Sequence, residues 1–186
     1  MSFTWTAHRF SGGALALDVA NSVVLRFDPR RRIDRFADGA AIEGFAEAAN
    51  LHGAEKTRFG TLAPIGPERQ ASLIDLREAT DRHFRAQIRS EDRPGLLADL
   101  LEAIAAILRR PSERCDYIAL DVATAHSALS LAANPEPDRL KICPNCEWLF
   151  LDRSRNRSRT WCDMAVCGNR TKAKRHYRRN KEETQP

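Results

Sequence analysis

The most informative stretch of the chain reads Cys143-Pro-Asn-Cys146 and is completed by Cys162-Asp-Met-Ala-Val-Cys167. Two residues separate the first cysteines, four separate the second, and fifteen lie between the two pairs. Each short pair places two thiolates at neighbouring corners of a tetrahedral ion, and the connecting segment brings the second pair to the opposite side. The spacing therefore predicts a structural Zn²⁺ site with these ligands: Cys143, Cys146, Cys162 and Cys167.

Other roles for the cysteines have less support in the sequence, and one of them stays open. Two disulfides would need an oxidising compartment, and the chain opens without the basic and then apolar segment of a secretory signal, so we expect reduced thiols in the cytoplasm. A redox dithiol would be expected in a βαβ unit, which the pattern does not indicate. Iron bound by four thiolates stays an alternative, although the basic and polar surroundings favour zinc. Cys115 remains as a buried or reduced thiol.

The segments around the cysteines are strongly basic. The loop between the pairs carries Arg153, Arg155, Arg157 and Arg159. The last cysteine is followed by Arg170, Lys172, Lys174, Arg175, Arg178 and Arg179, with no acidic residue between 170 and 179. On a helix these six cations share an arc of roughly 200°. Opposite them lie Val166, Ala173 and Tyr177, which we expect to pack on the metal module. Solvated faces normally mix both signs of charge, so the pattern predicts a surface that binds a polyanion.

These residues closely resemble the CGNR-type zinc finger over roughly 140–179. The matching runs are Cys143-Pro-Asn-Cys146-Glu-Trp-Leu-Phe-Leu-Asp152, Arg153 to Arg159, Trp161 to Met164, and Cys167-Gly-Asn-Arg170. The resemblance implies that the four cysteines bind metal. It also implies a C-terminal module of bacterial proteins that are regarded as stress-induced transcription regulators and are expected to bind DNA. Trp148, Phe150 and Trp161 are expected to form the small core of this module.

A looser resemblance links the start of the chain to the ABATE domain that commonly precedes this finger. It rests on Gly12-Gly13, on Leu15-Ala-Leu-Asp18 and on Asn21-Ser22. The expected organisation is a helical ABATE-like domain at 1–138 with a sensor or oligomerisation role, a zinc finger at 139–180 and a flexible tail at 181–186.

Charge follows the same division. Residues 139–186 hold 13 Lys or Arg against 5 Asp or Glu, a net of +8, whereas residues 1–138 hold 17 against 20, a net of −3. Basic character confined to one end indicates a nucleic-acid module attached to a neutral or acidic body. No apolar run has the length needed to span a bilayer, so we expect no membrane partner.

Hydrophobic periodicity predicts a mainly α fold with a short β strand or hairpin. Helices are expected at 39–51 with Asp38 as N-cap, from Pro67 onward, from Asp92 and Pro94 to just before Pro111, and from about Tyr117 to Ala133. Within the third of these, Leu97 and Leu101 are expected to face inward with Leu100 and Ile104. Phe3 and Trp5 alternate with polar residues, which predicts a short N-terminal strand.

No catalytic motif is present, so we expect a protein that is not an enzyme. Asp18 and Asn21 share one face of the first helix, and Arg26 lies nearby. These three residues either line a small-molecule pocket or form a buried network, and we favour the network.

The leading hypothesis is a DNA-binding transcription regulator in which the basic loop and helix contact duplex DNA. A homodimer is expected because one small module buries little area on DNA. The competing hypothesis is a zinc-stabilised interaction or oligomerisation protein whose basic face meets an acidic partner. A third is a body that binds a small effector molecule without binding DNA.

Overall fold

The computed structural model describes residues 3–91, 93–110 and 116–183, with the backbone alone for 180–183. The helical elements are η1 (Ala7–Phe10), α1 (Leu15–Ala20), η2 (Arg35–Ala37), α2 (Gly39–His52), α3 (Lys56–Phe59), α4 (Pro67–Ile88), α5 (Pro94–Leu108), α6 (Leu120–Ala133), η3 (Met164–Gly168) and α7 (Asn169–Glu183). The strands are β1 (Val23–Val24), β2 (Ile33–Asp34), β3 (Thr61–Ala63), β4 (Tyr117–Ala119), β5 (Leu140–Ile142) and β6 (Leu149–Leu151). The predicted mainly helical fold is confirmed.

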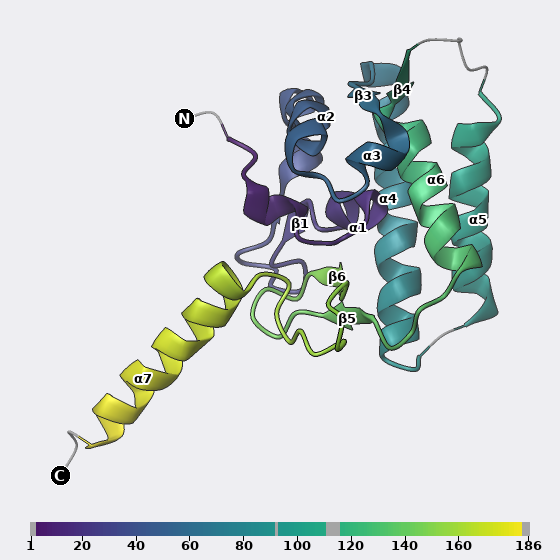
Figure 1. Ribbon diagram of the computed structural model, residues 1–186. Helices are drawn as coiled ribbons and strands as arrows, with labels where there is room; N and C mark the ends of the chain where they lie inside the picture. The colour runs from purple at the N-terminus through teal and green to yellow at the C-terminus, as the bar shows by residue number, and fades with distance from the viewer. Residues whose placement is uncertain (1–2, 92, 111–115, 184–186) are drawn as a thin grey trace.

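Helices α4, α5 and α6 lie side by side and form the largest layer of the molecule (Figure 1). Pro67 opens α4, as predicted, and its buried stripe includes Leu73, Leu76 and Phe84. Helix α1 packs against α4 and α6, and its six residues are all buried. No helix in the described ranges is both long and apolar enough to cross a lipid bilayer.

The strands form three two-stranded sheets. β1 pairs with β2 and β5 with β6 in antiparallel fashion, whereas β3 and β4 are parallel. Helix α2 begins after Asp38, whose carboxylate accepts a hydrogen bond from the amide of Ala40 at 3.0 Å, so the predicted N-cap is confirmed.

Two of the predicted element boundaries are wrong. Residues 3–6 form no strand: the indole of Trp5 donates to the carbonyl of Ala41 at 2.8 Å and its ring meets Phe45 edge-on, so the alternation reflects packing onto α2. The helix expected from Tyr117 begins at Leu120, because residues 117–119 pair with β3 as a strand. Asp92, Pro111 and Cys115, named above, lie outside the described residues.

The predicted inward orientation of Leu97 and Leu101 on α5 is also wrong. Their exposed fractions are 39% and 44%, whereas Leu100 and Ile104 are buried as predicted. Helix α5 is apolar on nearly every side, so periodicity alone could not identify which side meets α4 and α6.

Candidate metal centre and nucleic-acid interface

The first cysteine pair lies in the turn of the β5–β6 hairpin. Strand pairing aligns Ile142 with Leu149, and the amide of Cys143 donates to the carbonyl of Trp148 at 2.9 Å. The turn closes through the amide of Glu147, which donates to the carbonyl of Cys143 at 2.8 Å and has a positive φ of 62°. Non-glycine residues seldom adopt this left-handed backbone conformation. Here it closes the turn so that both thiols point toward one place.

The second pair is held by the short helix η3. The Asp163 carboxylate accepts hydrogen bonds from the amides of Ala165 at 2.8 Å and Val166 at 3.2 Å, and so caps η3. Cys167 lies in η3 and Cys162 just before it. Thr171 donates its hydroxyl to the carbonyl of Cys167 at 3.1 Å, which joins the ligand turn to the start of α7.

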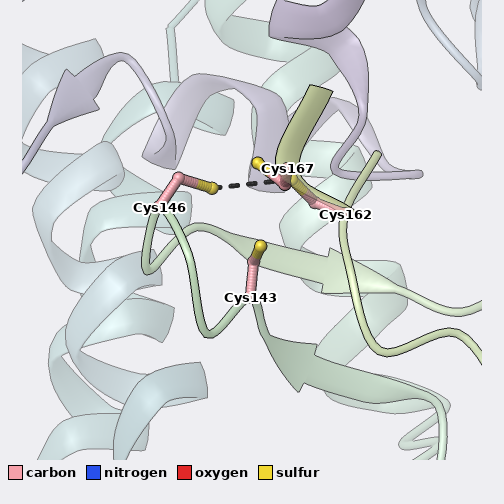
Figure 2. A group of neighbouring side chains, drawn as sticks. All are labelled: Cys143, Cys146, Cys162 and Cys167. Carbon is pink, nitrogen blue, oxygen red and sulfur yellow. Dashed lines mark hydrogen bonds between the residues drawn. The ribbon is translucent and has the colours of Figure 1, made fainter. Parts of the chain in front are cut away.

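All four sulfur atoms meet in one place (Figure 2). The four Sγ atoms lie within 4.8 Å of one another; the Cys146–Cys162 separation is 3.5 Å and the Cys162–Cys167 separation is 3.7 Å. Thiolates around tetrahedral zinc at about 2.3 Å from the ion lie roughly 3.8 Å apart. Three of the four cysteines are buried and Cys146 is half-buried. The donor set and its spacing fit Zn²⁺, so the chain has a structural zinc site.

Crowding of the thiols makes them strongly interdependent. Hydrogen bonds from Cys146 and then Cys162 lower the pKa of the Cys143 thiol, whereas the interaction with Cys143 raises the pKa of Cys146. One thiolate is thus favoured and further negative charge is disfavoured. A bound divalent cation supplies the positive charge that lets all four ionise.

A small aromatic core supports the centre, as predicted. Trp148 and Phe150 are buried, and Trp161 is half-buried against the cysteines. Gly168 leaves room for both neighbours: a Cβ at this position would overlap Met164 Sδ and lie 3.2 Å from the indole of Trp161, so a larger residue would need the exposed Met164 side chain to move and the indole to shift slightly.

Asp152 organises the loop between the two pairs. Its fully buried carboxylate accepts from Lys141 Nζ at 2.8 Å and from the amides of Ser154 at 2.9 Å and Arg159 at 2.8 Å. Burial alone would raise the pKa of this carboxyl, but the hydrogen bond from Lys141 and those from Ser154 and Arg159 outweigh it and lower the pKa. Lys141 also donates to the carbonyls of Arg157 and Arg159, so the backbone of the loop is held in place.

Three of the four loop arginines have partners within the molecule. Arg153 donates to the carbonyl of Gly13 at 2.8 Å, and Arg157 pairs with Asp138 at 3.0 Å. Arg159 donates to the carbonyl of Cys162 and lies over the ring of Phe150. Arg155 is exposed, with no hydrogen bond or ion pair among the described residues. Arg153 and Arg157 are exposed as well, and Arg159 is half-buried.

Helix α7 projects away from the rest of the molecule (Figure 1). Its six predicted cations are all exposed: Arg170, Lys172, Lys174, Arg175, Arg178 and Arg179. The expected packing edge is wrong, because Ala173 is exposed and Tyr177 is 76% exposed; Val166 alone is half-buried. The helix extends to Glu183, three residues into the predicted tail, and 184–186 lie outside the described residues.

The hairpin is joined to the helical body through backbone groups. The amide of Leu151 donates to the carbonyl of Gly12 at 2.8 Å. The Asn21 side chain donates to the carbonyl of Leu149 at 2.8 Å and accepts from its amide at 2.9 Å. Gly13 has a φ of 79°, and a Cβ there would lie 3.0 Å from the carbonyl oxygen of Leu151. The Gly-Gly turn is therefore the surface on which β6 docks.

The N-terminal segment also reaches the metal module, which sequence patterns did not reveal. His8 Nδ1 lies 2.9 Å from the Asp163 carboxylate, and its ring stacks on Trp148. Although burial alone would raise the pKa of Asp163, the hydrogen bonds from His8 and the amides of η3 lower it. Arg9 lies over Trp148, and burial, followed by the nearby charges of Arg35 and Arg170, lowers its pKa. Over 130 residues separate His8 from these partners, so no local spacing could signal the contact.

The suggested polar cluster near the first helix is divided among different partners. Asp18 is buried and accepts from the amide of Gly12 at 2.7 Å, while its second oxygen has no hydrogen-bond partner within the described ranges. Asn21 holds β6, and Arg26 pairs with Glu78 at 2.5 Å and Asp81 at 3.4 Å on α4. These contacts fit the interpretation as a buried network, and a ligand-binding role for the three residues stays a prediction.

A comparison with known families matches the C-terminal segment. Residues 139–180 match the family model of the CGNR zinc finger, which covers the hairpin, the four cysteines and the described start of α7. No curated protein matches the chain.

Proposed function

We propose that this chain is a non-catalytic, cytoplasmic regulator of transcription that binds double-stranded DNA through α7 and the neighbouring arginine loop. The observation that carries the proposal is the exposure of α7. From Lys172 to Arg179 every side chain is exposed, and the segment 169–181 contains no acidic residue. A cationic helix that leaves the body in this way suits the major groove of B-DNA, which is wide enough to admit an α-helix.

The loop supports this proposal in a different way. Arg153 and Arg157 are exposed although each has a partner in the molecule, and the network around Asp152 fixes their backbone. Cations held in place suit phosphate contacts, which set the position of a protein on the duplex. The cations of α7 have no ion-pair partner among the described side chains, and such cations suit base edges. Arg155, exposed between them, would contact either.

The helical body would then serve as a sensor or assembly unit. The resemblance of residues 12–22 to the ABATE domain supports this role, and so does the docking of β6 on the Gly12–Gly13 turn, which couples the body to the metal module. An effector that altered this turn would reach the DNA-binding end through a few backbone contacts. We propose no catalytic step.

Fluorescence anisotropy with duplex DNA, on the zinc-loaded chain, tests the proposal. We expect the logarithm of the binding constant to fall linearly with the logarithm of salt concentration between about 50 and 200 mM, with a slope that corresponds to roughly four or more phosphates. Replacing Lys174 and Arg178 by Glu reverses both charges and should reduce the affinity for DNA by at least tenfold without loss of zinc.

A matched variant separates specific contact from net charge. Lys56→Glu with Arg109→Glu reverses the charges of one lysine and one arginine, both exposed. Lys56 begins α3 and Arg109 follows the last residue of α5, and both helices lie away from α7 (Figure 1). Each double variant lowers the formal charge from +5 to +1, because every reversal changes it by two. Two outcomes would contradict the proposal and favour an acidic protein partner. One is an equal loss of DNA affinity in both double variants, and the other is negligible DNA binding by the natural chain at about 50 mM salt.

A further inference from the structure

Helices α5 and α6 share an outer surface without charged side chains. Together they hold 29 residues, 15 in α5 and 14 in α6, and only Asp99, Glu102 and Asp121 are charged. Asp121 is fully buried and pairs with Arg69 at 2.7 Å. Asp99 and Glu102 line the open groove between α5 and α4, on another side of α5. Protein surfaces usually carry about one charged residue in three or four, so a face of two helices with none is unusual.

The apolar residues of this face are aligned on both helices. On α5, Leu97, Leu101 and Leu108 fall within roughly 40° of the helical wheel, and the first two are 39% and 44% exposed. On α6, Leu129 is 37% exposed and lies within roughly 60° of Val122, His126 and Ala133. The helices are neighbours and run in opposite directions at one edge of the molecule (Figure 1). Their exposed stripes therefore form one continuous surface, which we name the α5–α6 face.

We propose that the α5–α6 face binds the same face of a second copy of this chain, forming a symmetric homodimer. In a two-fold contact each patch meets itself, so a patch with an excess of one sign of charge would meet its own sign. A face without charge avoids that repulsion, and it offers no charge by which a different partner would be selected.

The size of the face agrees with this occupant. At 1.5 Å per residue each helix is roughly 22 Å long, and packed helices lie about 9 Å apart, so the face covers roughly 400 Å² in projection. Accessible surface exceeds projected area because side chains are convex. Pairing two faces would therefore bury on the order of 1,000 Å² in total, which is at the lower end for a specific interface. We expect a micromolar dimer that has fully dissociated at nanomolar concentration.

The dimer does not depend on DNA binding. If the chain binds DNA, the dimer would determine how the two α7 helices are placed on it. The face lies on α5 and α6, away from α7 (Figure 1). A dimer would leave both α7 helices unobstructed and carry them as a pair, as proteins that read two half-sites do.

Analytical ultracentrifugation of the zinc-loaded full chain tests the proposal. We expect a mass of twice 21.0 kDa at about 100 µM and dissociation on dilution. Leu101→Glu should raise the dissociation constant of the dimer at least tenfold. The double variant Leu101→Glu with Leu129→Glu should raise it at least a hundredfold. Because these side chains are partly exposed in one copy, far-UV circular dichroism should show that the variants remain folded.

Leu51→Glu is the control, since Leu51 on α2 is 69% exposed and lies off the face. It should leave the dimer unchanged. A natural chain that is monomeric at 100 µM would overturn the proposal, as would a dimer that Leu101→Glu and Leu51→Glu weaken equally. DNA binding should also be measured on the monomeric Leu101→Glu variant. Because this variant keeps α7 unchanged, its DNA binding tests the proposed function separately from the proposed dimer.

Discussion

At the scale of single residues, Asp18 is a carboxyl buried inside the helical body. It is buried beneath the Gly12 amide, and burial, opposed by that hydrogen bond and reinforced by the nearby charge of Glu55, raises its pKa well above the usual range. The folded state therefore holds this proton more tightly than the unfolded chain does. The stability that comes from binding the proton is full below the unfolded pKa of about 4 and is lost as pH rises through the folded pKa.

We therefore expect Asp18→Asn to stabilise the chain more at pH 8 than at pH 6, relative to the natural protein. The amide oxygen of Asn keeps the hydrogen bond from Gly12, and the variant has no charge to bury. Urea unfolding midpoints of both proteins at the two pH values measure the effect, with Asp99→Asn on the exposed side of α5 as control. If the difference in unfolding midpoint between Asp18→Asn and the natural protein is the same at both pH values, this account is contradicted.

At the scale of elements, η3 links the metal site to α7. Asp163 caps η3, pairs with His8 and so determines where Cys167 and the start of α7 lie. Removing such a cap costs about 1 kcal/mol, and here the loss should also loosen one ligand turn.

Asp163→Ala should lower zinc affinity several-fold and the free energy of unfolding by about 1–2 kcal/mol. Asp163→Asn, which retains an acceptor for the amides of Ala165 and Val166, should lose less. Competition with a chromophoric chelator measures the affinity. Asp38→Ala removes the cap of α2 and should affect stability alone. Equal zinc affinity in Asp163→Ala and the natural protein would contradict the role given to η3.

At the scale of the whole molecule, the metal hairpin is part of the main hydrophobic core. Leu140, Leu149 and Leu151 of the hairpin belong to the same buried cluster as Leu17 of α1 and Leu76 of α4. Metal binding is therefore expected to stabilise the helical body as well as the module, because folding and metal binding are coupled.

Removing zinc with a chelator, or substituting Cys146→Ser, should lower the melting temperature of the chain as a whole. A loss of about 3–5 kcal/mol corresponds to roughly 10 °C for a chain of this size. Amide hydrogen exchange should accelerate in α1 as well as in residues 139–183. Faster exchange confined to the C-terminal segment would show that the hairpin and the body are energetically independent.

The sequence alone determined the parts that depend on local spacing. The four ligands follow from cysteine intervals, α2 and α4 from apolar periodicity with Asp38 and Pro67 at their starts, and the basic helix from closely spaced cations with no acidic residue among them. These are properties of neighbouring residues, so one chain is enough to read them.

Only the tertiary structure decided which surfaces meet. It placed Leu97 and Leu101 outward on a helix that is apolar nearly all round, left Tyr177 exposed, and made residues 117–119 a strand by pairing them with β3. It also brought His8 to Asp163. Each of these outcomes depends on contacts between segments far apart in the chain, and the free energy of such contacts is set by the partner surface and leaves no periodic trace in the local sequence.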